Sequence, residues 1–385
     1  MVATNLFGPW RRGEEEEDKR AFERSRPSPR ALLYSPCLRV HSRFKSLSFS
    51  SYSICENLRK FAVKLVVSGK QVRKLDKTKT RQEMDQTNDW LYTPDGTPRG
   101  YIQPQLLREL WFHTGTACNL ACPFCLEGSK PGNHRLEQIT LADAAPWIDE
   151  AIDLGVAQFS FTGGEPFINR DIFEIFRYAL ARRPCMVLTN GTRPLRKRWN
   201  EVLALGDAAH ALRFRVSLDF PDPPRHDAGR GEGNFALALE TLAMLHEAGF
   251  SVSIARQMTK DEDRAAVEQA FQALFRKAGI PEDIHQVAFP DFHGPSTHPT
   301  GVPHITENCM TQYQTADSRA AFMCNFSKMV IKTAGRMRVY ACTLVDDDPD
   351  YDQGASLAEA MPLRVMMRHH RCFSCFRYGA SCSEV

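Results

Sequence analysis

Three cysteines, Cys118, Cys122 and Cys125, stand together at C-x3-C-x2-C spacing in this 385-residue chain. Three thiolates on one tight loop can ligate three irons of a cubane iron–sulfur cluster. No fourth cysteine follows nearby, so one iron would stay open for another ligand. Structural zinc sites usually have four ligands in paired C-x2-C units. The spacing therefore favours a cluster, and the alternatives are a zinc knuckle or three unrelated buried thiols.

A second motif, Gly163-Gly164-Glu165-Pro166, directly follows a strand-like segment after the cysteine loop. Two glycines at a strand end let a ligand approach the backbone closely, and the glutamate supplies an acceptor. Together the two motifs resemble the radical S-adenosylmethionine (SAM) superfamily. That resemblance implies a [4Fe-4S] cluster on the three cysteines, with the aromatic Phe124 before the last of them. It also implies an open iron that binds the amino and carboxylate groups of SAM, with Gly163–Pro166 against that amino group.

Later segments fit the same resemblance, which covers roughly residues 105–290. The turn containing Thr189 and Asn190 is similar to the family's Thr-Asn-Gly turn near SAM, and its alternative is an ordinary Asn-Gly turn. Ser217 and Asp219 correspond to residues that approach the sugar or methionine part of SAM. The stretch 226–231 is similar to a His-Asp-x-x-Arg-Gly segment of peptide-modifying members. Its Arg230 could pair with a carboxylate through the guanidinium fork, or be an exposed loop arginine.

The C-terminal cysteines resemble the cysteine-rich tail called SPASM, or its shorter twitch relative, which binds auxiliary [4Fe-4S] clusters. The resemblance implies one auxiliary cluster, with Cys324, Cys342 and two of Cys372, Cys375 and Cys382 as ligands, while Cys309 is left outside the set. The gap of six residues between Gly335 and Cys342 is longer than the family's usual one. Zinc is the alternative, because a C-x2-C pair such as 372–375 is also a zinc-type pair.

Alternating strand-like and helix-like segments must position these residues. Thr140 and Asp143 form a capping-box pattern that predicts a helix ending at Gly155. Repeated β-then-α units with short connections predict an α/β fold with parallel strands, whose carboxyl ends carry the site. We expect a partial (β/α)6-type barrel with a small cysteine-rich C-terminal module that contains a hairpin. The predicted strands are 107–112, 158–162, 186–188, 213–218, 250–255 and 285–289, and the other predicted helices are 171–181, 235–248 and 261–278.

Charge divides the chain unevenly. Residues 1–83 hold 19 Lys/Arg against 9 Asp/Glu, which leaves 30 against 37 for the rest, a balance of −7. A basic nucleic-acid-binding body is therefore not expected, and no run of about eighteen apolar residues predicts a membrane span. The chain divides into a disordered extension (1–83), a lead-in (84–104), a radical SAM core (105–292) and an auxiliary domain (293–385). The extension is either an upstream segment before a native start at Met84, which we prefer, or a transit peptide.

Four further features have ordinary readings. His113 at a strand end is expected to be a satisfied histidine rather than a SAM or substrate contact. Cys185 reads as a small buried hydrophobe. The acidic run 346–350 and the pair His369 and His370 read as solvated loop residues rather than cation or metal sites.

The resemblance implies reductive cleavage of SAM to a 5′-deoxyadenosyl radical, which abstracts hydrogen from the substrate. We expect a peptide or protein side chain as substrate. A small molecule, as for the molybdenum-cofactor cyclase, is the alternative, and a zinc-binding scaffold is the non-enzymatic one. An electron donor of the flavodoxin or ferredoxin type and a cytoplasmic or organelle-matrix location are expected. No acid–base residue is assigned.

Overall fold

The computed structural model describes residues 89–259, 262–290, 293–379 and 383. The chain divides into two units, Met1–Asp76 and Lys77–Val385, and all described residues belong to the second. The predicted extension 1–83, its proposed start at Met84 and the candidate ligand Cys382 therefore lie outside the described residues. Within the described part, no helix is both long and apolar enough to cross a membrane.

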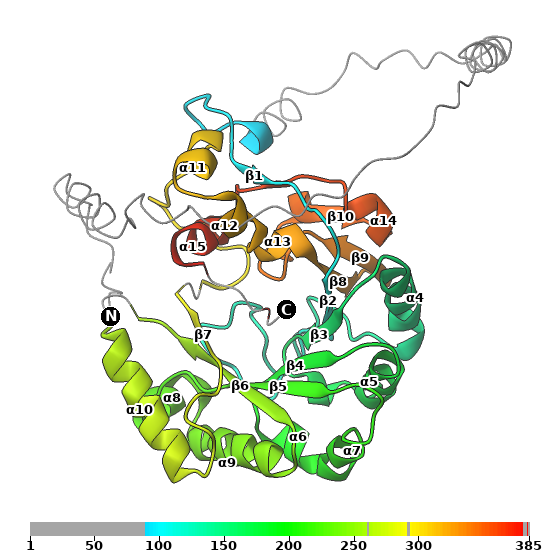
Figure 1. The fold of residues 1–385 in the computed structure, drawn as a ribbon, viewed down its shortest axis with the longest axis vertical. Coiled ribbons are helices and arrows are strands. Elements are labelled where there is room, and N and C mark those ends of the chain that lie inside the picture. Colours follow the sequence, from blue (N-terminus) through cyan, green and yellow to red (C-terminus); the bar gives the residue numbers. More distant parts are fainter. Residues whose placement is uncertain (1–88, 260–261, 291–292, 380–382, 384–385) are drawn as a thin grey trace, which may run out of the picture. The chain divides into compact units, whose positions relative to one another are not determined.

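Six parallel strands form the centre of the fold and confirm the predicted alternation (Figure 1). Each strand pairs with the next along the chain, so the sheet grows in sequence order. Their carboxyl ends consequently lie along one edge, where the loops that follow them meet. The strands are β2 (Glu109–His113), β3 (Gln158–Thr162), β4 (Cys185–Thr189), β5 (Leu212–Ser217), β6 (Ser251–Gln257) and β7 (Gln286–Phe289).

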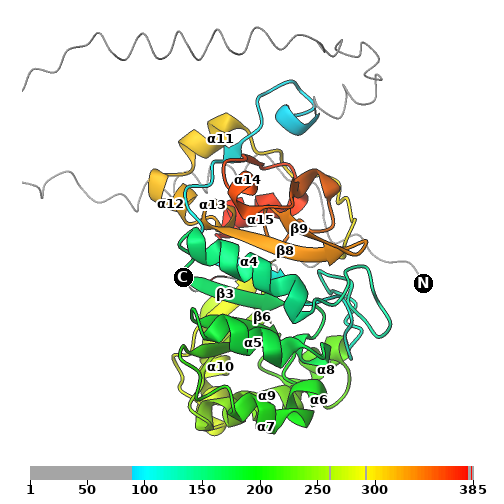
Figure 2. The same cartoon turned by 90° about the vertical axis from the view of Figure 1, so that its right-hand side faces the viewer.

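Helices cover the outer face of this curved sheet (Figures 1 and 2). The first begins with the predicted capping box, in which Thr140 and Asp143 each accept from the other's backbone N–H. The helix expected from 261 starts at Arg264, because the Asp263 carboxylate caps it by accepting from the Ala266 N–H. The helices are α4 (Leu141–Asp153), η1 (Pro166–Ile168), α5 (Ile172–Leu180), α6 (Arg193–Lys197), α7 (Trp199–Leu203), α8 (Pro223–Arg230), α9 (Asn234–Glu247) and α10 (Arg264–Lys277).

Alternation along β2 assigns the two faces of the sheet. Leu110 and Phe112 are buried in the core beneath the outer helices. Trp111 points to the opposite face and packs with Met186 in a second core shared with the C-terminal module. Successive side chains of a strand point to opposite faces, so one strand contributes to both cores.

The C-terminal module extends the same sheet. The predicted hairpin is present as β8 (Ser327–Thr333) and β9 (Arg336–Tyr340). Strand β8 also pairs in parallel with β2, so the described sheet runs β10-β9-β8-β2-β3-β4-β5-β6-β7. The sequence did not reveal this pairing. The remaining elements are β1 (Tyr101–Ile102), α11 (Glu307–Gln312), α12 (Ala316–Ala320), α13 (Met323–Phe326), η2 (Pro349–Tyr351), β10 (Asp352–Gly354), α14 (Leu357–Ala360), β11 (Val365–Met366) and α15 (His370–Tyr378).

The capping box at the start of α4 predicts a measurable loss on truncation. Thr140→Ala removes the side-chain acceptor for the Asp143 N–H and should lower the free energy of unfolding by about 1 kcal/mol. Thr140→Ser keeps the hydroxyl and should stay close to wild type in the same chemical denaturation experiment. Equal stability of the alanine and serine variants would show that the cap contributes nothing.

Candidate functional site

Four loops meet at the carboxyl edge of the parallel sheet. The cysteine loop follows β2, the Gly-Gly-Glu-Pro bend follows β3, the Thr-Asn-Gly turn follows β4, and Asp219 lies just beyond β5. The sequence motifs are therefore brought together, as the parallel topology requires.

The Gly-Gly-Glu-Pro bend is joined to the cysteine loop through the backbone. The Gly164 N–H donates to the Gly115 carbonyl at 2.8 Å, and the Glu165 N–H donates to the Ala117 carbonyl at 3.1 Å. A Cβ on Gly164 would overlap the Ala117 carbonyl, and one on Gly163 would lie 2.7 Å from the Thr114 hydroxyl. Gly163 also has a φ of +149°, which side chains with a Cβ rarely adopt. Both positions consequently require glycine.

All three loop thiols are half-buried. Burial, together with the nearby Glu165, Cys122 and Cys125, raises the pKa of Cys118 to about 12. The Leu120 N–H lies 3.4 Å from the Cys118 sulfur, and the Ser129 N–H lies 3.3 Å from the Cys125 sulfur. Such donors favour thiolates. A bound metal would offset the remaining free-energy cost of a buried thiolate, because the metal ligates the deprotonated sulfur.

Glu165 is fully buried and held by three elements. Its carboxylate accepts from the Thr189 hydroxyl at 2.8 Å, from the Asn190 N–H at 2.8 Å and from the Phe167 N–H at 3.2 Å. Burial raises the pKa of Glu165 to about 7 despite these donors. The same residues start η1, in which Glu165 is the cap and Pro166 the first residue. The bend thus presents a fixed carboxylate at the strand ends.

Asn190 connects the third loop to the first. Its side-chain amide donates to the Asn119 side chain at 3.0 Å and lies 3.7 Å from the Cys118 sulfur. Asn119 in turn donates to the Thr192 hydroxyl at 3.0 Å. This turn is therefore more than an ordinary Asn-Gly turn, because it contacts the cysteine loop.

Asp219 and Arg230 form a two-point ion pair beneath the cysteine loop. The two contacts measure 2.5 and 3.1 Å, and the Arg230 side chain is 13% exposed. Arg230 ends α8, so the alternative of an exposed loop arginine is wrong. Its guanidinium lies over the Phe124 ring at 5.6 Å, and its positive charge lowers the pKa of Cys122 against the dominant effect of burial. A cation close to these thiols suits an anionic cluster.

Helix α8 packs directly against the cysteine loop. A Cβ on Gly229 would overlap the Phe124 ring, so this helix position also needs glycine. The buried His226 accepts from the Asp219 N–H at 3.2 Å, and Asp227 accepts from the first residues of α9. Each polar member of the 226–231 stretch therefore has a structural partner. Ser217, the last residue of β5, is half-buried opposite Ala255 of β6.

Three of the auxiliary cysteines cluster in the C-terminal module. Burial raises the pKa of Cys324 and Cys372, and the charge of Cys342 raises both further. Cys375 lies one turn after Cys372 on α15, and it borders the same apolar core as Cys309. The Thr306 hydroxyl donates to the Cys309 sulfur at 3.2 Å. Cys382 lies outside the described residues.

A buried lysine, which the sequence did not reveal, accompanies these thiols. Lys328 on β8 is fully buried, and its ammonium donates to Gln353 at 2.7 Å. Burial lowers the pKa of Lys328 to about 8, while nearby Cys324 and Cys342 oppose that shift. A buried cation needs a counter-charge. Thiolates at Cys324 and Cys342 would provide it.

The sulfur spacing distinguishes a single ion from a cluster. A tetrahedral zinc ion with Zn–S bonds of about 2.3 Å holds its sulfurs about 3.8 Å apart. In the described part of the chain, no three cysteine sulfurs all lie within 4.8 Å of one another. A cluster binds its cysteines through different irons and so separates them more widely. Among the described residues, the sulfurs of neither cysteine group are therefore spaced as a single zinc ion would hold them.

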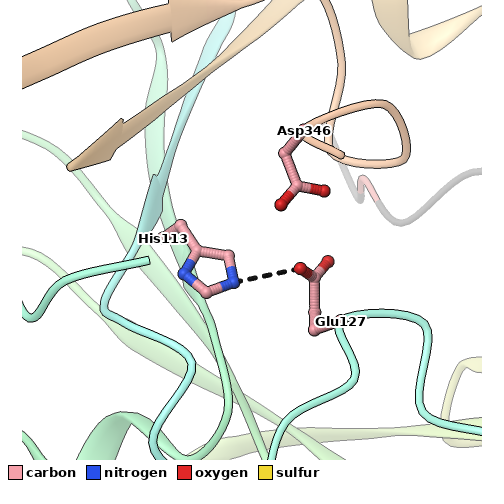
Figure 3. Close-up of side chains that lie close together, drawn as sticks. All are labelled: His113, Glu127 and Asp346. Atoms are coloured by element: carbon pink, nitrogen blue, oxygen red, sulfur yellow. Dashed lines mark ion pairs between the residues drawn. The ribbon is translucent and has the colours of Figure 1, made fainter. Parts of the chain in front are cut away.

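One group of potential metal ligands is compact, namely His113, Glu127 and Asp346 (Figure 3). The Gly115 N–H donates to Nδ1 of His113 at 3.1 Å, which assigns the ring proton to Nε2. Nε2 lies 3.2 Å from the Glu127 carboxylate. A metal would need the Nε2 lone pair, and Arg135 already contacts both carboxylates. The group is thus a buried ion cluster. His113 meets the expectation of a satisfied histidine only at Nδ1, because its buried Nε2 lies near Glu127 but has no hydrogen-bond partner among the described residues.

Two expectations about the C-terminal module need correction. The acidic run is solvated only at its end, because the side chains of Asp346 and Asp347 are 1% and 3% exposed whereas that of Asp350 is 54% exposed. His369 is not a solvated histidine either, because it caps α15 and lies 3.4 Å from Asp347. His370 is half-buried beside it. Cys185 is fully buried, as predicted.

Comparison with known proteins separates the same two parts of the chain, the core of parallel strands and the C-terminal module. The family model described as "Radical SAM superfamily" matches residues 112–274, from the end of β2 through α10. This part of the chain is a radical SAM domain. The matched region contains all four loops described above but not the C-terminal cysteines.

Two curated relatives match the radical SAM core. Mycofactocin maturase MftC of Mycolicibacterium smegmatis is 31% identical over 45% of this chain and 46% of its own length. AdoMet-dependent heme synthase of Nitratidesulfovibrio vulgaris is 30% identical over 38% of this chain and 39% of its own length. The chain thus spans half or less of the length of these relatives. A solved structure, Streptococcus suis SuiB, is 14% identical and covers 91% of this chain and 76% of that chain, with a TM-score of 0.48.

The superfamily implies a [4Fe-4S] cluster and SAM, and the residues present suit both. Cys118, Cys122 and Cys125 offer three sulfurs with nearby N–H donors and a cation. Glu165 offers a fixed carboxylate, which suits an ammonium group. The donor set matches a three-cysteine cluster with one open iron.

Replacement of the second bend glycine tests the contact between the two loops. Gly164→Ala places a methyl group against the Ala117 carbonyl and should lower the free energy of unfolding by about 1–3 kcal/mol. Gly294→Ala is the matched control, because a Cβ there meets nothing. It should change stability by less than about 0.5 kcal/mol in chemical denaturation. Equal stabilities of the two variants would contradict the close approach.

His226 predicts an acid-side loss of stability. Burial and the Arg230 charge lower the pKa of His226 to about 4, whereas an unfolded chain has about 6.5. As the pH falls from about 7 to about 5, the unfolded chain takes up the proton first. This residue should therefore cost about 2 kcal/mol of unfolding free energy over that interval. His226→Asn should reduce the pH slope, while exposed His134→Asn should not; an unchanged slope in both variants would refute the assignment.

Proposed function

We propose that this protein is a radical SAM enzyme that cleaves SAM reductively and abstracts hydrogen from a peptide or protein side chain. The observation that carries the proposal is the backbone connection between the Gly-Gly-Glu-Pro bend and the residues just before Cys118. It brings a cluster-binding loop and a carboxylate suited to an ammonium group to one edge of the sheet.

The roles of the chain's residues follow from their contacts. When bound, the cluster would supply the electron that splits SAM into methionine and a 5′-deoxyadenosyl radical. Cys118, Cys122 and Cys125 would hold that cluster, and Arg230 would offset part of its negative charge. The Gly163–Pro166 bend would lie against the SAM amino group, while Asn190 keeps the turn after β4 against the cysteine loop. Phe124 packs against α8 at Gly229, which would hold the cysteine loop in place.

We assign the auxiliary cysteines to a second [4Fe-4S] cluster. The proximity of Cys324, Cys342 and Cys372 and the buried Lys328 beside them support this assignment. Such a cluster would bind substrate or accept the electron left after bond formation. An external donor of the flavodoxin or ferredoxin type would reduce the first cluster, in a reducing compartment.

A peptide substrate is supported by the name of the relative MftC, a maturase, and by the 226–231 stretch against the cysteine loop. A small-molecule substrate is the second candidate, because the heme synthase matches the same core at similar identity. Anaerobic incubation with deuterium-labelled peptides or labelled small-molecule extract separates them. Transfer of label into 5′-deoxyadenosine from the peptide fraction supports the first candidate, and transfer from the small-molecule fraction alone supports the second.

Metal analysis and SAM cleavage test the enzyme itself. Anaerobically purified protein should contain about eight irons with matching acid-labile sulfide, and should release 5′-deoxyadenosine when reduced with SAM. Cys122→Ala should abolish that release, while Cys375→Ala should leave uncoupled cleavage largely intact. Cys185→Ala, which alters a buried cysteine outside both groups, should retain iron and cleavage. Stoichiometric zinc without sulfide would contradict the proposal.

A further inference from the structure

Two arginines, the half-buried Arg135 and the buried Arg371, join the cysteine loop to the C-terminal module. They contact Leu126 and Glu127, the two residues that directly follow Cys125. On the other side they contact the segment 344–347, which closely follows Cys342. No sequence motif marks either arginine, and neither belongs to the radical SAM motifs.

Arg371 binds three carbonyl groups from separate segments. Its guanidinium donates to the carbonyls of Leu344 at 2.9 Å, Leu126 at 3.1 Å and His293 at 2.8 Å. The residue is 2% exposed, and Asp347 lies 3.5 Å away. Arg371 is also the covalent neighbour of Cys372. A single side chain therefore contacts the segments beside one ligand of each proposed cluster and adjoins a second auxiliary ligand.

Arg135 makes the same connection through carboxylates. One of its terminal nitrogens lies 2.7 Å from the Glu127 carboxylate and 2.7 Å from the Asp346 carboxylate. The His113 ring also lies next to the Glu127 carboxylate (Figure 3). The side chain of Asp346 is 1% exposed.

Loss of these contacts would cost considerable free energy. Removing one partner of a buried ion pair leaves an uncompensated charge, and a buried unpaired polar group costs far more than a surface one. The cysteine loop at 126–127 and the module segment at 344–347 are therefore expected to shift together. The two segments lie more than two hundred residues apart in the chain, and these side chains add a direct connection between them to the pairing of β8 with β2.

We propose that Arg135 and Arg371 are positioning residues that couple the SAM-cluster site energetically to the auxiliary cysteine site. Ordering of Cys342 and Cys372 by an auxiliary cluster fixes segment 344–347 and Arg371, and the two arginines transmit that order to the residues after Cys125. By linkage, SAM binding at the first site then strengthens the second equally. This inference rests on the proposed function, since it presupposes both clusters.

A double-mutant cycle measures this coupling. SAM dissociation constants are determined anaerobically by equilibrium dialysis for wild type, Cys342→Ala, Arg135→Met and the double variant. In the wild-type background, Cys342→Ala should weaken SAM binding about tenfold, within the usual range of coupling between sites. In the Arg135→Met background the same change should alter affinity by less than about twofold. Arg371→Met should suppress the effect of Cys342→Ala similarly.

A spectroscopic readout separates positioning from mere stability. The electron paramagnetic resonance signal of the reduced SAM cluster, and its change on SAM addition, should differ between wild type and Arg135→Met. Arg338→Met is the matched control, because its partner Asp352 lies in the C-terminal module and the pair has no contact with the cysteine loop. That variant should retain the wild-type signal and affinity. If Arg135→Met does not fold, Arg135→Lys and Asp346→Asn enter the same cycle, with a smaller loss of coupling expected.

The outcomes distinguish this inference from the proposed function. If wild type neither assembles a cluster nor binds SAM, the proposed function fails, and the inference with it. If wild type does both, but Cys342→Ala weakens SAM binding equally in the wild-type and arginine-variant backgrounds, the coupling is overturned while the function stands. The same holds if Cys342→Ala has no effect on SAM binding in wild type.

Discussion

The site depends on two backbone hydrogen bonds that cross the carboxyl edge of the sheet. They join Gly164 to Gly115 and Glu165 to Ala117. A side chain larger than hydrogen at Gly164 would separate the loops, so two neighbouring strands and a glycine together set the distance between cluster ligands and carboxylate. The other two loops then contact the cysteine loop, one through Asn190 and the other through α8. The binding geometry is thus a property of backbone packing rather than of any single reactive residue.

Electrostatics explain why the chain can hold so many sulfurs in its interior. Burial disfavours thiolates, as the raised pKa of Cys118 shows, and the chain answers with cations and N–H donors. Arg230 lies near the first cysteine group, and Lys328 lies near the second. Both cations are withdrawn from solvent. Inside the protein their charge is only weakly screened. Two sites of similar charge balance therefore sit on one continuous sheet, connected by Arg135 and Arg371.

Much of this arrangement could be predicted from local sequence. The strand 158–162 alternates clearly, Thr140 and Asp143 mark a helix start, and the motif loops fall at strand ends because parallel strands place them there. Contacts between residues far apart in the chain left no such signal in the sequence. Strand β8 joins β2 across most of the chain, and Asp346 meets Arg135 at a separation of 211 residues. An acidic run is expected to be solvated unless its partners are known. Only the fold shows that Asp346 and Asp347 are buried.

A cluster on three cysteines with one iron open to SAM can be examined by electron–nuclear double resonance on the reduced protein. SAM is labelled with ¹⁵N at the amino group and ¹⁷O at the carboxylate. We expect hyperfine couplings from both labels, of a size that requires direct bonding to iron, and their loss in a protein lacking Cys122. Absence of both couplings in a protein that contains its full iron complement would contradict it.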